Sequence, residues 1–147
     1  MAIQLRPVGN PMKVFLSHSQ TDAWLAARVA QALNARGLEV QDPQQEVLPG
    51  DNWASKVAQA LEDSEAMIVL LTPDAAKSQH VKHEMEYALG AKKYSNRLIP
   101  VVVGDRNRLP AGEIPWIVRR MPWFELDDTE SGNPEVEPIA QAILAHA

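Results

Sequence analysis

Residues 67–103 read MIVLLTPDAAKSQHVKHEMEYALGAKKYSNRLIPVVV, and this stretch decides the fold. Residues 67–72 and 98–103 are short apolar runs, which is typical of strands buried on both faces of a sheet. Between them, an amphipathic segment that Ser78 can cap predicts a helix ending at about Lys93. A strand, a helix and a second strand in this order predict two parallel strands joined by a crossover.

The same alternation extends to both sides of this unit. Further strands are expected at 13–17, 38–41 and 121–126, and further helices around 23–36, 54–61 and 135–145. Residues 42–52 and 106–115 carry prolines and glycines and are expected to form exposed loops. Pro100 predicts an edge position or an irregularity in its strand. The pattern predicts an α/β fold, a flavodoxin-like three-layer sandwich with a five-stranded, mostly parallel sheet and helices on both faces.

The composition restricts the class of protein. The 147 residues carry 14 Lys and Arg against 19 Asp and Glu, a net charge of −5, which argues against nucleic acid or a membrane surface as a direct partner. The length suits one domain, which we place at 12–147 after an N-terminal extension at 1–11. The absence of cysteine excludes disulfides and thiol nucleophiles and favours a cytoplasmic location.

The sequence also argues against a membrane-spanning helix, a signal peptide and the two common glycine-rich nucleotide-binding motifs. No apolar run approaches the roughly 20 residues of a membrane-spanning helix, and the N-terminus lacks the features of a signal peptide. The seven glycines stand at least eight residues apart, so neither a G-x-G-x-x-G fingerprint nor a P-loop is present.

Glu84 is the most informative residue of the central helix. At about 100° per residue it falls at the edge of an apolar arc, whereas Glu86 points to the opposite side. The arc comprises Val81, Met85, Ala88 and Leu89. A carboxylate there must be hydrogen-bonded, paired or facing a cavity, and functional carboxylates concentrate in such places. The alternative is that Glu84 rims the helix and reaches water.

The end of the first strand offers Ser17, His18 and Ser19. Neighbouring strand residues point to opposite faces, so Ser17 and His18 cannot form a nucleophile–base pair, and a hydrolase triad is not expected. Backbone N–H groups and hydroxyls at this point can hold an anion, or they can simply cap the following helix. For the second reading, Ser19 and Asp22 resemble a capping box.

His80 and Trp53 each leave two readings open. His80 and Glu84 are neighbours on one helix, but a metal site with His83 would need another segment, so no metal is expected and His80 can be a surface residue. Trp53 ends the loop VLPGDNW and can stack on a base or anchor its helix. The other tryptophans, expected in the core or at an interface, are Trp24, Trp116 and Trp123.

The segments VFLSHSQTD, LPGDNW, the 67–92 stretch and LIPVVV, in this order over about residues 13–103, resemble a Toll/interleukin-receptor (TIR) domain of bacterial type. The tail fits the fold but matches weakly. The resemblance implies a flavodoxin-like fold. It also implies either cleavage of NAD+, as in many members, or action through TIR–TIR contacts alone, as in others.

Catalytic members of this family carry Ser-x-Trp-x-x-x-Glu on the third helix, with a small residue four positions later. Ser78, His80, Glu84 and Ala88 occupy these positions here, so the resemblance implies a catalytic Glu84 and a His80 in place of tryptophan. The first loop and the Pro-Gly loop correspond to the nucleotide-contacting segments of the family. The expected substrate-binding residues are Ser17, His18, Ser19, Gln20, Pro49, Gly50, Trp53 and His80.

The expected activity is that of an NAD+ glycohydrolase or cyclase, with NAD+ as substrate and no cofactor. Nicotinamide leaves as a neutral base, so a lone carboxylate that stabilises the cationic ribose is sufficient. The product can be ADP-ribose or a cyclic form. Catalytic TIR sites are commonly completed by a neighbour's Pro-Gly loop, which implies a homo-oligomer switched on by assembly.

Other readings stay open. The chain can be a non-catalytic TIR–TIR module or a nucleoside deoxyribosyltransferase-like enzyme, which shares the fold class. It can be a stand-alone effector, as in phage defence, or a domain working with an upstream sensor or downstream effector. A phosphoacceptor receiver is disfavoured because residues 17–19 are not acids.

Overall fold

The computed structural model describes residues 11–46, 50, 52–127 and 134–145. Residues 1–10 of the expected N-terminal extension therefore lie outside the described residues. The strands are β1 (Lys13–Ser17), β2 (Glu39–Gln41), β3 (Ala66–Leu71), β4 (Leu98–Val103) and β5 (Phe124–Leu126). The helices are α1 (Ala23–Asn34), α2 (Pro43–Glu46), α3 (Trp53–Asp63), α4 (Pro73–Lys77), α5 (Gln79–Gly90), α6 (Trp116–Arg119) and α7 (Glu137–Ala145). Short 3₁₀ turns are η1 (Gln20–Asp22), η2 (Lys92–Tyr94), η3 (Arg106–Arg108) and η4 (Ala111–Glu113).

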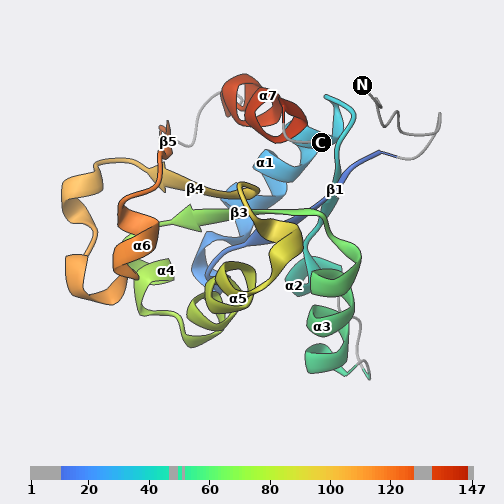
Figure 1. Ribbon diagram of the computed structural model, residues 1–147, viewed down its shortest axis with the longest axis horizontal. Coiled ribbons are helices and arrows are strands. Elements are labelled where there is room, and N and C mark those ends of the chain that lie inside the picture. Colours follow the sequence, from blue (N-terminus) through green and yellow to red (C-terminus); the bar gives the residue numbers. More distant parts are fainter. Residues whose placement is uncertain (1–10, 47–49, 51, 128–133, 146–147) are drawn as a thin grey trace.

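The strands form one sheet in the order β2-β1-β3-β4-β5, with every neighbouring pair parallel (Figure 1). Ser17 of β1 is level with Val69 of β3, so the carboxyl ends of these two central strands lie at the same edge. The predicted three-layer, flavodoxin-like architecture is confirmed.

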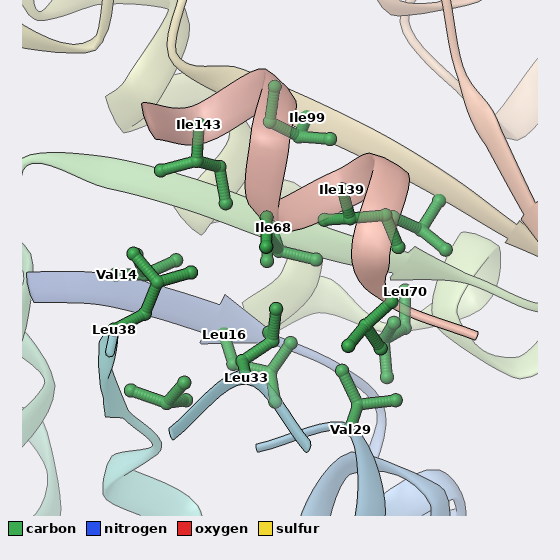
Figure 2. Close-up of a cluster of buried hydrophobic side chains, with 14 of the residues drawn as sticks. Val14, Leu16, Val29, Leu33, Leu38, Ile68, Leu70, Ile99, Ile139 and Ile143 are labelled. Carbon is green, nitrogen blue, oxygen red and sulfur yellow. The ribbon is translucent and has the colours of Figure 1, made fainter. Parts of the chain in front are cut away.

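Two apolar cores lie on opposite faces of the sheet. On one face, α1 and α7 pack against alternate strand residues such as Leu16 and Ile68 (Figure 2). On the other face, α3, α4, α5 and α6 cover the intervening residues, among them Phe15 and Val69. Because side chains alternate along a strand, Ser17 lies on the same face as Phe15, the face that α5 covers.

Several local predictions hold, and others are wrong. Ser78 caps α5 as predicted, its hydroxyl accepting a hydrogen bond from the Val81 amide. The edge position predicted as one option for Pro100 is wrong, because its strand β4 lies between β3 and β5. Pairing between β4 and β5 begins only at Val101, so the hydrogen bonds between these two strands need no N–H group from Pro100. The expected loop at 42–52 begins with α2, and the last strand is only three residues long.

The tryptophans do not share one environment. Trp24 and Trp116 are 43% and 68% exposed, so a place in this domain's core is wrong for both. Trp123 is half-buried and packs against the core beside α6. Within the described ranges, no helix combines the length and apolarity needed to cross a membrane.

Candidate functional site

The candidate site lies where β1 and β3 end side by side. The helix after β1 packs on one face of the sheet, and the helices after β3 pack on the other. Connections that diverge in this way leave a crevice outside the carboxyl ends of the two strands, where open α/β sheets bind ligands. A cleft of about 480 Å³ is found there. It is lined by Ser19, Gln20, Thr21, Trp53, Asp74, Ser78 and His80.

Glu84 is buried one helical turn deeper than His80. It belongs to the buried stripe of α5 and is only 4% exposed, so the alternative that it reaches water is wrong. The Ser17 hydroxyl donates a 2.7 Å hydrogen bond to Glu84 Oε1. The strand alternation explains this contact, because it turns Ser17 toward α5.

The pKa of Glu84 is raised to a value close to neutral pH. Burial raises its pKa to about 7, although the Ser17 hydrogen bond and the nearby His18 charge act in the opposite direction. The charge of Asp42 adds to the upward shift. A carboxyl group that changes charge near pH 7 is suited to catalysis, because both forms are populated under working conditions.

His18 and Asp42 form a buried pair on the other side of β1. The His18 ring is fully buried, and its Nε2–H donates to Asp42, with both carboxylate oxygens 2.9 Å away. Its Nδ1–H donates to the Ser19 carbonyl at 2.7 Å. Burial lowers the pKa of His18, but the hydrogen bond and charge of Asp42, the hydrogen bond to the Ser19 carbonyl and the charge of Glu84 together leave the pKa raised. Both ring nitrogens face acceptors, which is the pattern of a charged imidazolium.

Asp42 is a site residue that the sequence reasoning missed. It was expected in an exposed loop, yet it is 5% exposed. The signal was its position directly after β2, whose carboxyl end lies beside that of β1. Since Ser17 bonds to Glu84 and His18 bonds to Asp42, these neighbours form no pair with each other, as predicted.

His80 closes the floor of the cleft. The His18 carbonyl accepts hydrogen bonds from His80 Nε2–H at 2.9 Å and from the side-chain amide of Gln44, in α2, at 2.8 Å. The Gln44 nitrogen lies 2.6 Å from His80 Nε2, and the Ser78 hydroxyl donates to His80 Nδ1 at 3.0 Å. Trp53 meets the His80 ring edge-on, with 5.8 Å between the ring centres. Within the described residues, no group of three or more potential metal ligands comes together.

The rim of the cleft is acidic. The hydroxyls of Ser19 and Thr72 both donate to Asp22 Oδ2 at 2.6 Å, and the Thr21 hydroxyl donates to Asp74 at 2.8 Å. The expected capping box is wrong, because Ser19 bonds to the Asp22 side chain and makes no side-chain cap. Carboxylates take up the hydroxyls that an anion would need, so the reading of this turn as a phosphate cradle is not supported.

The structure divides the predicted site residues into three groups. Ser19, Gln20, Trp53 and His80 line the cleft, whereas Ser17, His18 and Glu84 are buried beneath it. Gly50 is exposed with φ of 91°, a backbone conformation that favours glycine, and is not among the lining residues. Pro49 lies outside the described residues. Residues that the sequence reasoning missed are Thr21, Asp42, Gln44, Thr72 and Asp74.

Comparison with known proteins identifies the family. A family model described as the TIR domain matches residues 14–143. The chain belongs to the TIR domain family. No curated protein sequence matches this TIR domain.

Solved structures share the fold of this TIR domain. The TIR domain of the Toll-related receptor TRR-2 from Hydra magnipapillata is 20% identical, with a TM-score of 0.62 over 90% of this chain and 94% of that one. A TIR-STING receptor from C. gigas in complex with 2′,3′-cGAMP is 25% identical, with a TM-score of 0.70 over 88% of this chain and 38% of that one. A point mutant of flavodoxin from Pseudomonas aeruginosa is 20% identical, with a TM-score of 0.54 over 90% of this chain and 99% of that one.

Proposed function

We propose that this TIR domain cleaves the bond between nicotinamide and ribose in NAD+, with Glu84 as the catalytic carboxylate. The observation that carries the proposal is the position of Glu84. It is a buried carboxyl group with a pKa of about 7, one turn from His80 on α5 and beneath the cleft at the ends of β1 and β3. Family membership supports it, because the resemblance that implied NAD+ cleavage placed the same residue in the catalytic position.

The chemistry requires one carboxylate and no acid. The C1′–N bond breaks with its electron pair going to the nicotinamide nitrogen, so the leaving group departs neutral. Positive charge then develops on the ribose, and an ionised Glu84 lying beside it stabilises that charge. When water attacks C1′, the proton it releases can pass to a carboxylate whose pKa is about 7 and then to solvent. When a group of the same molecule attacks, the product is cyclic.

The charge of the cleft suits the nicotinamide end of the substrate. Among the described residues that line it, there is a carboxylate, Asp74, and no Lys or Arg. An acidic rim attracts a pyridinium cation and disfavours the pyrophosphate. Trp53 and His80 supply aromatic surface on which a planar ring can pack.

Access to Glu84 provides the regulatory step of the proposal. In the described conformation the His18 carbonyl and Gln44 hold His80 in place, and Glu84 does not line the cleft. We infer that substrate reaches Glu84 when α2 and His80 move, and that contact with a second copy near Gly50 drives this movement. Activity per molecule should therefore fall on dilution. Activity that stays constant on dilution would contradict self-assembly as the switch.

A non-catalytic TIR–TIR module is the second candidate. The burial of Glu84 favours it, because a carboxylate that no substrate reaches cannot catalyse. It predicts partner binding that substitutions at Pro49 or Gly50 abolish, and no loss of NAD+ even in the assembled protein. A cytoplasmic location and a sensor or effector partner are likewise proposals.

Mass spectrometry of the products separates these functions. The protein at high concentration, with a crowding agent, is incubated with NAD+ and, in parallel, with free deoxynucleosides. Nicotinamide together with ADP-ribose or a cyclic isomer, absent with Glu84→Ala, supports the proposal. Turnover of deoxynucleosides in place of NAD+ supports a deoxyribosyltransferase-like enzyme. If the protein turns over neither substrate, the non-catalytic TIR–TIR module is the remaining candidate.

A further inference from the structure

A second pocket lies at the same edge of the sheet, beyond β4, and shares no residue with the candidate site. Its volume is about 390 Å³, within the range of small-molecule sites. Figure 1 shows α6 and the segment before it beyond the tips of β3 and β4. The lining residues are Arg106, Trp116, Arg119, Arg120 and Trp123.

Packing against the core holds side chains of this pocket in place. Val118 of α6 is fully buried, so the flanking residues of the same short helix are turned outward. Trp123 packs against that core and is half-buried. The guanidinium of Arg106 lies over the Trp123 ring, 5.1 Å from its centre. One arginine and one tryptophan are thus held together before any ligand arrives.

Among the described residues, no carboxylate balances the positive charge of the pocket lining. Three arginines line the pocket. In the same part of the chain, the structure gives Arg119 and Arg120 no ion pair, whereas Lys82 and Arg36 pair with glutamates. Like charges gathered in one pocket repel one another, and a bound anion relieves this repulsion. Guanidinium groups suit phosphate in particular, because they donate two parallel hydrogen bonds to its oxygens.

The pocket also offers an unused aromatic face. Trp116 is 68% exposed, the most exposed of the large apolar side chains of the described chain. A planar base can stack on such a ring, and base–aromatic stacking tolerates every base. Phosphate alone would leave this face in water, so the combination of arginines and tryptophan favours a ligand with an anionic end and a planar end.

We propose that this pocket binds a free nucleotide, with its phosphate on the arginines and its base on Trp116. A nucleic acid strand is disfavoured as the ligand, because the whole chain carries a net charge of −5 and repels a polyanion. The proposal is independent of NAD+ cleavage, since it uses none of the residues around Glu84.

Calorimetric titration of the full chain with AMP and, separately, with inorganic phosphate tests the proposal. The variants are Arg119→Gln combined with Arg120→Gln, Trp116→Ala, and Lys92→Gln, which removes a positive charge from the other end of the sheet. We expect the double variant to bind AMP at least about tenfold more weakly. Trp116→Ala should weaken AMP by about fivefold or more and leave phosphate unchanged. Lys92→Gln should match the wild type.

Three results would overturn the proposal: no AMP binding by the wild type, equal AMP affinity in the double variant, or stronger binding of a short oligothymidine than of AMP. Thermal unfolding of each variant shows whether it folds; the substituted side chains are exposed, so little change is expected. A Trp53→Ala variant separates the two sites, because Trp53 lines the candidate cleft and not this pocket. Its AMP affinity should equal that of the wild type, whether or not the protein cleaves NAD+.

Discussion

The Ser17 hydroxyl lies 2.7 Å from Glu84 Oε1, although the two residues are 67 positions apart in the sequence. This bond joins the end of β1 to the buried face of α5 and orients the carboxylate beneath the cleft. Burial raises the pKa of Glu84 to about 7, and the Ser17 bond limits that rise by favouring the ionised form. We therefore expect Ser17 to act as a positioning residue that influences the pH at which the carboxylate is charged.

Replacing Ser17 should move the pH dependence of NAD+ cleavage. In the wild type we expect the rate to rise through pH 7, as Glu84 ionises. Ser17→Ala removes the donor, raises the pKa of Glu84 further, and should shift the rising limb upward by about one pH unit. Rates of nicotinamide release between pH 5.5 and 9 measure the shift. An unchanged midpoint would show that Ser17 does not tune the carboxylate.

Glu84→Gln should stabilise the fold at alkaline pH. Between its ordinary pKa of 4.5 and about 7, folded Glu84 holds a proton that the unfolded chain releases, so the free energy of unfolding falls as the pH rises through this window. Removing the ionisable group should raise the free energy of unfolding at pH 8 by up to about 3 kcal/mol, and by less at pH 5. Thermal unfolding at both pH values measures this. Exposed Glu86→Gln is the control, and a Glu84 variant that behaves like it would refute the raised pKa.

Asp42→Asn should weaken the fold. The substitution removes the charge opposite the buried His18, which we expect to lower the free energy of unfolding by roughly 3 kcal/mol near pH 6. Because the pKa of His18 is raised, the pair stabilises fully below pH 6.5, and its contribution is lost as the pH rises through the raised value. The difference in the free energy of unfolding between the wild type and Asp42→Asn should therefore become smaller as the pH rises through this value. Asp63→Asn, on the exposed face of α3, should change stability by no more than about 0.5 kcal/mol.

Trp53→Ala should impair substrate binding more than folding. The ring is 40% exposed and lies edge-on to His80 at the cleft, so its loss removes the packing surface that we propose for the nicotinamide. We expect the KM for NAD+ to rise about tenfold, with Trp53→Phe retaining most of the affinity. Steady-state kinetics at several NAD+ concentrations measure this. Equal KM values for the wild type and the alanine variant would remove Trp53 from the binding site.

The fold was predictable because its signals are local. The apolar runs at 67–72 and 98–103 and the stripe of α5 identify buried strands and a helix on their own, and the same stripe placed Glu84 at its edge. Short elements carry weaker signals, so α2 and α6 were missed. Pairs such as His18 and Asp42 depend on which strands are neighbours, which no single segment of sequence records.

The role of each site residue was harder to predict than its location. Ser19 and Asp22 have the spacing of a capping box, but the hydroxyls of Ser19, after β1, and Thr72, after β3, both donate to the Asp22 carboxylate instead. His80 was compared with the family tryptophan, yet its contacts with Gln44 and Trp53 come from α2 and α3. Such contacts follow only from the packed tertiary structure.

Nicotinamide release by three proteins measured side by side tests the central claim most directly. The wild type, Glu84→Gln and Glu86→Gln are incubated with NAD+ at the same high protein concentration, and released nicotinamide is quantified over time. The two variants lose one carboxylate each from the same helix, one buried and one exposed. The account predicts that Glu84→Gln loses at least about a hundredfold in rate, while Glu86→Gln keeps the wild-type rate. Equal turnover by the wild type and Glu84→Gln would contradict it.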